Sequence, residues 1–268
     1  MKKFLKVAAV LSAALLLVGV GYFADMFLGN PISGWQARQL TKAHLEKNYK
    51  NTDYEIERIG YDFKMGDYVA YITSPTNIDG DFVVRIDNGK VEFDNYDRVV
   101  SSFSNTKRRL NEEYYHLLDG VLVGNSLFPY DVRSWAELLF EPLDGTTLPE
   151  DALLLGNLEL NKLYDVKALG KNQGYLHVTV RGESATYERA AEILLEMKAL
   201  CEQVGTPFYA VHFTIFEPNA TSSDFYFRYF LYEDIYEEGL TERLQKSREE
   251  TKAYWEQVFA EKEQKEKE

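Results

Sequence analysis

The chain has 268 residues, with 43 acidic and 30 basic side chains and a net charge of −13. An acidic surface repels phosphate groups, which argues against nucleic-acid binding and against lying flat on an anionic membrane. Cys201 is the sole cysteine. No disulfide can therefore form within the chain, no cysteine-based zinc site is available, and no cysteine near the N-terminus can accept a lipid.

The N-terminal segment has the pattern of a membrane-targeting sequence. Three lysines within the first six residues precede an uncharged run of 18 residues, Val7–Ala24. A membrane-spanning helix needs about 20 apolar residues, whereas the apolar part of a cleaved signal has about 7–15. The run favours an uncleaved membrane anchor that consists of residues 1–28 and contacts the membrane through residues 4–28. A cleaved signal is the alternative. Because the lysines come before the run, we expect a cytoplasmic N-terminus and an extracytoplasmic remainder.

Residues 33–119 predict a first α+β domain. Ser33 is a plausible N-cap for a helix over Gly34–Tyr49, and the dipeptide Asn88-Gly89 predicts a two-residue hairpin turn. Gly60 is expected at a bulge in the first strand. A second helix is expected over Asp97–Leu118, from one apolar stripe at helical spacing. The predicted strands are Tyr54–Phe63, Tyr68–Thr73, Phe82–Ile86 and Val91–Phe93.

The rest of the chain predicts a connector and a second α+β domain. The connector covers 120–150, contains a short helix over Trp135–Phe140, and places the domain boundary near 145–150. The second domain covers 151–236 and is followed by a charged helix and tail over 237–268. Its predicted elements are a partly helical Asp151–Leu169, strands over Tyr175–Arg181, Phe208–Phe216 and Phe225–Tyr232, a helix from Thr186 or Tyr187 to Val204, and a helix over Tyr236–Phe259. The fold class is α+β, with one transmembrane helix and two small domains that each pair helices with an antiparallel sheet.

Several segments resemble a known family. In the first domain they are GNPISGWQARQLTKAHLEKNY, DYEIERIGYDFKMGDYVAYITSP and DFVVRIDNGKVEFDNYD, and in the second they are YDVKALGKNQGYLHVTV, TYERAAEILLEMKALCEQVGTPFYAVHF and RYFLYEDIYEEGL. Asn30-Pro31, Asp53-Tyr54-Glu55-Ile56 and Asn88-Gly89-Lys90 occur in the family's order. The chain resembles the YfjL-like membrane-anchored proteins of Gram-positive bacteria over most of residues 1–240. The first domain is also similar to the DUF3139 family. The resemblance implies a two-domain layout and a membrane topology, and it supplies no activity.

One face of the second predicted sheet carries the candidate site. Side chains alternate along a strand, so neighbouring strands would bring tyrosines, histidines and arginines to a common face. Such residues are typical of binding surfaces, and an arginine can pair with a carboxylate or phosphate. The alternative is an ordinary solvated face, or one packed on the C-terminal helix. The candidate ligand-binding residues are Tyr175, His177, Arg181, His212, Tyr226 and Arg228.

No pattern indicates catalysis, a metal or a cofactor. The two strand histidines lack a third ligand at metal-binding spacing, and His44 and His116 are expected in surface or capping roles. Cys201 lies on the apolar stripe of its helix, which favours an inert buried thiol. We therefore expect a non-enzymatic binding or regulatory module at the cell envelope, with an envelope protein or polymer as partner. The alternatives are an envelope hydrolase with an unrecognised acidic site, and a structural partner of another membrane protein.

Overall fold

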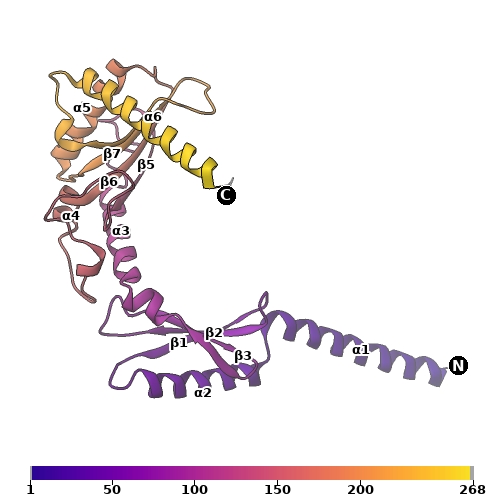
Figure 1. The fold of residues 1–268 in the computed structure, drawn as a ribbon. Coiled ribbons are helices and arrows are strands. Elements are labelled where there is room, and N and C mark those ends of the chain that lie inside the picture. Colours follow the sequence, from indigo (N-terminus) through magenta and orange to yellow (C-terminus); the bar gives the residue numbers. More distant parts are fainter. Residues whose placement is uncertain (1, 266–268) are drawn as a thin grey trace. The chain divides into compact units, whose positions relative to one another are not determined.

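The computed structural model describes residues 2–265 and divides the chain into two compact units (Figure 1). The first unit consists of Met1–Thr106 with Glu159–Asn161, and the second of Lys107–Leu158 with Lys162–Glu268. Each unit contains one four-stranded sheet packed against helices. The predicted α+β class is confirmed.

The chain begins with a long apolar helix, α1 (Lys2–Leu28). Within the described residues, the one candidate membrane span starts at Leu11 in this helix, and none of its apolar window is buried in the protein. α1 ends before Gly29, which has a φ of +75°, and α2 (Pro31–Asn48) follows after Asn30. The Asn30 side chain accepts a hydrogen bond of 2.8 Å from the Ile32 N–H. Asn30 is therefore the N-cap in place of Ser33, with Pro31 in the first turn, where its missing N–H costs no helix hydrogen bond.

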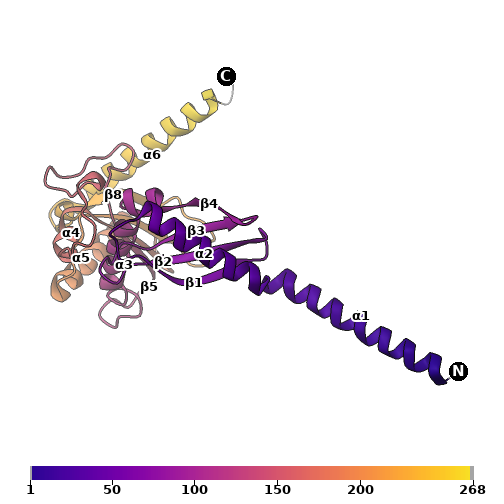
Figure 2. The same cartoon turned by 90° about the horizontal axis from the view of Figure 1, so that it is seen from below.

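The first sheet is a meander of β1 (Glu55–Asp62), β2 (Asp67–Thr73), β3 (Phe82–Asp87) and β4 (Lys90–Asp94), all antiparallel in chain order. α2 lies along one face (Figure 2) and buries Ala37 and Leu45 against it. Asn88 and Gly89 have φ values of +48° and +72°, which confirms the predicted hairpin turn. The bulge in β1 lies between Ile56 and Arg58, where the register shifts, and Gly60 pairs regularly with Val69.

The helix predicted over Asp97–Leu118 is interrupted. A π-helical turn covers Asp97–Ser101, Phe103 takes a φ of +60°, and α3 covers Ser104–Leu118. Left-handed backbone at a bulky residue is rare, because the side chain meets its own carbonyl. The break lies three residues before the boundary between the two units.

The second sheet has the strand order β5 (Asp131–Leu138), β6 (Gly174–Arg181), β7 (Ala210–Phe216) and β8 (Tyr226–Leu231). The helix predicted over Trp135–Phe140 is wrong, and the segment predicted as a connector contains β5. Along β5, Val132, Ala136 and Leu138 are buried in alternation with exposed or half-exposed residues, which is the period of a strand.

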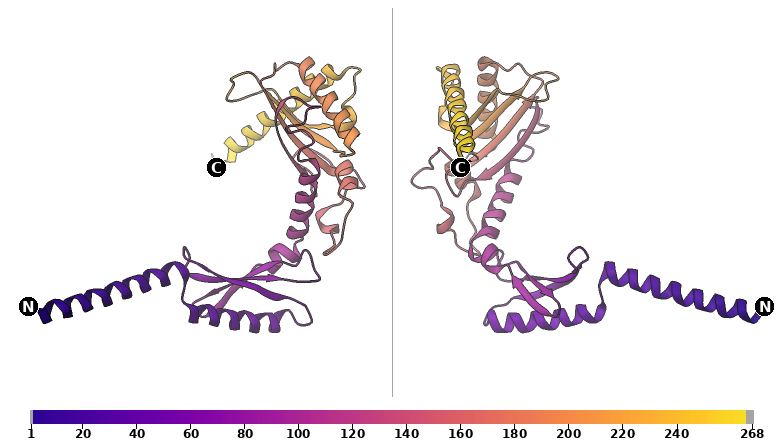
Figure 3. Two further views of the ribbon diagram at one scale, coloured as in Figure 1. Left: turned by 180° about the vertical axis from the view of Figure 1, so that it is seen from behind. Right: turned by 45° about the vertical axis from the view of Figure 1, so that its right-hand side comes forward.

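Helix α5 (Tyr187–Val204) joins β6 to β7 as a crossover, so this one pair is parallel while the others are antiparallel. α5 lies along one face of the sheet (Figure 3). Its bounds match the prediction, because Thr186 accepts a hydrogen bond from the Arg189 N–H at the start and Gly205 takes a φ of +68° at the end. The short α4 (Val166–Gln173) precedes β6, capped by Asp165.

The C-terminal helix α6 (Leu240–Lys265) begins four residues later than predicted. The preceding segment forms a loop instead of helix, with Gly239 at a φ of +65°. The Arg243 guanidinium holds this loop by donating hydrogen bonds to three backbone carbonyls, those of Asp234, Tyr236 and Glu238. α6 then packs on the edge strand β8 and on α5.

Candidate functional site

A row of four rings crosses the second sheet on the face opposite α5, one from each strand. Trp135 on β5 is paired in register with His177 on β6, which is paired with His212 on β7. The ring centroids are 4.4 Å apart for Trp135 and His177, 5.5 Å for His177 and His212, and 5.6 Å for His212 and Tyr226 on β8. The last two pairs are stacked, with interplanar angles of 27° and 24°. We refer to Trp135, His177, His212 and Tyr226 as the ring row.

The ring row is accessible at its β5 end. Trp135 is 47 % exposed, although it lies within a sheet. The His177 side chain is 32 % exposed, and its Nε2 lies 3.7 Å from Glu137 Oε1, also on β5. Large aromatic side chains left in water at an edge strand have lost little of their apolar surface to the core and can bury it against a partner.

Tyr175 closes one side of the row. Its ring centroid lies 4.5 Å from that of His177, and only 3 % of the residue is exposed. Leu143 and Leu148, from the segment that follows β5, pack on the cluster that contains Tyr175. Burial raises the pKa of Tyr175 to about 12, so its hydroxyl stays protonated at neutral pH.

A bulge in β8 adds two further side chains beside the row. The register between β7 and β8 shifts between Val211 and Phe213, and Tyr229 takes a φ of +56°. This backbone is costly for tyrosine, and the Tyr229 hydroxyl is held by a 2.7 Å hydrogen bond to the Thr147 carbonyl. The Arg228 guanidinium lies 4.3 Å from the centre of the Tyr254 ring of α6.

The surroundings of His212 change the proton affinity of its imidazole. Burial lowers its pKa to about 4, and the neighbouring His177 and Arg228 lower it in the same direction. The imidazole is therefore neutral at pH 7 and can act as hydrogen-bond donor and acceptor; one nitrogen, Nε2, lies 3.3 Å from Thr214 Oγ1.

Five of the six predicted site residues come together, and one does not. Tyr175, His177, His212, Tyr226 and Arg228 contact one another or lie beside the ring row. Arg181 lies four residues beyond His177 along β6 and is stacked on Phe216, 4.7 Å from its ring centre.

The prediction missed Trp135, Glu137 and Tyr229. The first two lie on the strand that was predicted as a helix, although the alternation in 131–138 was a usable signal. Tyr229 joins the face only because of the bulge, and no residue type in this strand predicts a bulge.

The described side chains of this face are better suited to binding a partner than to catalysis. They contain no group of three or more histidine, cysteine, aspartate or glutamate side chains that could hold a metal ion. Cys201 is buried, and burial raises its pKa to about 12, so the thiolate is scarce at neutral pH. What the face presents is stacked rings, neutral imidazole and one guanidinium.

Comparisons with known proteins give the chain its family. Residues 1–95 match the model of the YfjL-like N-terminal domain, and residues 129–245 match that of the YfjL-like C-terminal domain. The chain is a YfjL-like protein. The two YfjL-like domains correspond to the two sheets, and the C-terminal one includes all four strands of the ring row. Searches of curated proteins and of solved structures found no match. The DUF3139 similarity stays a prediction.

Proposed function

We propose that this YfjL-like protein is a non-catalytic, membrane-anchored binding module whose second unit binds an envelope protein through the ring row. The observation that carries the proposal is the line of four rings across all four strands, with the exposed Trp135 at its β5 end. α1 is the anchor in this proposal, with the N-terminus in the cytoplasm and both units outside.

The chemistry of the face favours a protein partner. Tryptophan, tyrosine and arginine dominate the binding energy of protein interfaces because each buries a large, rigid surface and keeps one polar group to pair. Trp135 and Tyr226 are the two ends of the ring row, and Arg228 lies close to His212 within it. The net charge of −13 disfavours a nucleic acid. An envelope polymer is the alternative occupant, and the experiments below distinguish it.

The partner can be captured with the full-length protein in its own membrane. Cells would be cross-linked, and the proteins that co-purify would be identified by mass spectrometry. The test variants are Trp135→Ala and His177→Ala. The matched control is Val204→Ala, because Val204 is 43 % exposed and lies at the end of α5, away from the ring row.

We expect one protein to be recovered with the native chain and the control and to be lost with both test variants. Equal recovery with all four chains would remove the ring row from the binding surface. Recovery of polymer without protein would transfer the proposal to an envelope polymer.

The topology has its own test. Fusions placed after Lys265 would report the side of the membrane, using a phosphatase that is active only outside and a fluorescent protein that folds only inside. Active phosphatase and a dark fluorescent fusion are expected, and the opposite pattern would overturn the orientation.

A further inference from the structure

Exposed apolar side chains gather at one end of the first unit, beside the end of α1. Ile32 and Trp35 lie in the first turns of α2 and are 69 % and 63 % exposed, and Phe63 and Met65 lie in the β1–β2 turn and are 53 % and 70 % exposed. We call these four residues the apolar rim. Four such side chains in one place form an apolar patch that a purely water-exposed surface avoids.

A direct contact joins Phe63 of the apolar rim to the end of α1. The Phe27 and Phe63 ring centroids are 5.8 Å apart. Phe27 is the penultimate residue of α1, so the β1–β2 turn lies level with the last turn of this helix. The two-residue link between α1 and α2 is packed as well. A Cβ on Gly29 would lie 2.6 Å from Tyr61 Cγ, and the Tyr68 hydroxyl donates a 2.7 Å hydrogen bond to the Asn30 carbonyl.

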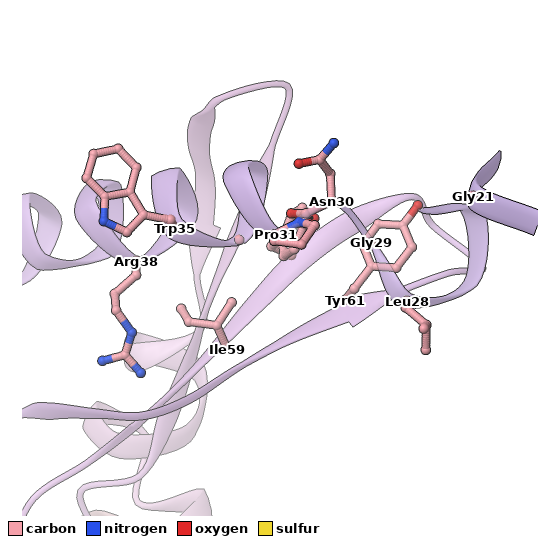
Figure 4. A pocket seen from close by; sticks show the side chains of 11 residues that line it. Gly21, Leu28, Gly29, Asn30, Pro31, Trp35, Arg38, Ile59 and Tyr61 are labelled. Atoms are coloured by element: carbon pink, nitrogen blue, oxygen red, sulfur yellow. Dashed lines mark hydrogen bonds between the residues drawn. The ribbon is translucent and has the colours of Figure 1, made fainter. Parts of the chain in front are cut away.

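A groove of about 680 Å³ opens beside this link, and Trp35 of the rim lines it (Figure 4). Trp35, Arg38 and Ile59 line it, and Figure 4 shows the Arg38 guanidinium pointing away from the helix on the side of the strands. Arg38 forms no ion pair with the acidic side chains that the structure describes. An unpaired guanidinium beside exposed apolar groups suits a phosphate ester, which it can bind with two hydrogen bonds.

The charges at this end allow contact with a bilayer despite the acidity of the whole chain. Asp67 is 4 % exposed and forms an ion pair with Arg85, whose guanidinium also lies 3.8 Å from Asp62. Lys64, at the tip of the turn, is exposed. Two acidic groups at this end, Asp62 and Asp67, thus lie against the Arg85 guanidinium.

We propose that the apolar rim is a membrane-contacting surface, in which Phe63 and Met65 enter the boundary between headgroups and acyl chains and Trp35 and Arg38 lie among the headgroups. The headgroup layer is about 5–7 Å deep on each side of the hydrocarbon. Trp35 lies four residues after Pro31, about 6 Å along α2, which matches that depth. Aromatic side chains are enriched at this level of membrane proteins, because the ring is apolar and its edge is polar. The inference rests on the anchor of the proposed function and concerns a different unit from the ring row.

Depth measurements on spin labels test the inference. Single cysteines would be introduced into the full-length protein as Phe63→Cys and Met65→Cys, with the buried Cys201 replaced by alanine. Leu17→Cys reports the middle of α1, where the side chain is 74 % exposed. Ile78→Cys is the matched control, because Ile78 is also apolar and 51 % exposed but lies in the β2–β3 loop, a strand length or about 20 Å away. Each labelled chain is placed in phosphatidylcholine nanodiscs, and collision with oxygen is compared with collision with a water-soluble nickel chelate.

We expect the label at 17 to be deep in the hydrocarbon and the label at 78 to be aqueous. The labels at 63 and 65 should lie at the headgroup boundary, with at least a tenfold lower nickel accessibility than the label at 78. The inference would be overturned, and the anchor left intact, by one result. In that result the labels at 63 and 65 are as accessible to nickel as the label at 78, while the label at 17 is deep. An aqueous label at 17 would overturn both.

Discussion

Replacing His212 by glutamine tests the environment of the ring row through its pH dependence. The pKa of His212 is about 4 in the folded chain, against 6.5 for an ordinary imidazole, first because the ring is buried and then because His177 and Arg228 lie close to it. Between pH 6.5 and 4 the unfolded chain binds the proton and the folded chain does not. The free energy of unfolding therefore falls as the pH falls through this window.

The size of the effect follows from the two pKa values. A difference of 2.5 units corresponds to about 3 kcal/mol when the pH is below 4, and to about 2 kcal/mol at pH 5 relative to pH 7.5. The native protein should lose this amount over that interval, and His212→Gln should not. Other groups titrate in both chains, so the difference between the chains isolates His212.

The assay has two parts. Urea denaturation of both full-length chains at pH 7.5 and pH 5 gives the difference in stability, and an NMR titration of the imidazole C2–H gives the midpoint directly. A midpoint near 6.5, or the same loss of stability in both chains, would refute the burial of the His212 ring beside His177 and Arg228.

Three further substitutions test how each unit is held together. Gln173→Leu should destabilise the second unit by about 3 kcal/mol in urea denaturation, because the buried Gln173 amide forms hydrogen bonds with one backbone N–H and two backbone carbonyls of neighbouring segments. A loss under about 1 kcal/mol would contradict this. Arg85→Met should lower the free energy of unfolding of the first unit by about 3 kcal/mol, because it leaves the buried Asp67 carboxylate unpaired. Adding Asp67→Asn should restore part of this stability, and no recovery in the double variant would show that the lost pairing is not the cause. Gly174→Ala should cost about 3 kcal/mol in thermal unfolding, because its Cβ would overlap the Tyr114 hydroxyl and a backbone carbonyl, and an unchanged midpoint would contradict that packing.

Local signals in the sequence were strong where one residue determines one backbone conformation. Asn88-Gly89 can both take a positive φ, and the prediction of a hairpin turn there is confirmed. Gly205 ends α5 where predicted for the same reason. Phe103 also takes a positive φ, but a phenylalanine gives no reason to expect it, so the break between the π-helical turn and α3 could not be predicted.

The candidate site was half predictable. Alternation along β6, β7 and β8 assigned the histidines to one face, because the period of a strand is two. Alternation cannot say which strands are neighbours. The pairing of His177 with His212 depends on the crossover by α5, and the place of Trp135 depends on the addition of β5 at the edge. Both are long-range arrangements that the core determines.

Site-specific photo-cross-linking can show directly whether the ring row contacts an envelope protein. p-Benzoylphenylalanine would replace Trp135 in one full-length chain and Val204 in another, and both chains would be irradiated in cells. We expect an adduct with one envelope protein from position 135, none from position 204, and loss of the adduct when Arg228→Ala is added to the first chain. No adduct from 135, or the same adducts from both positions, would contradict a binding surface at the ring row.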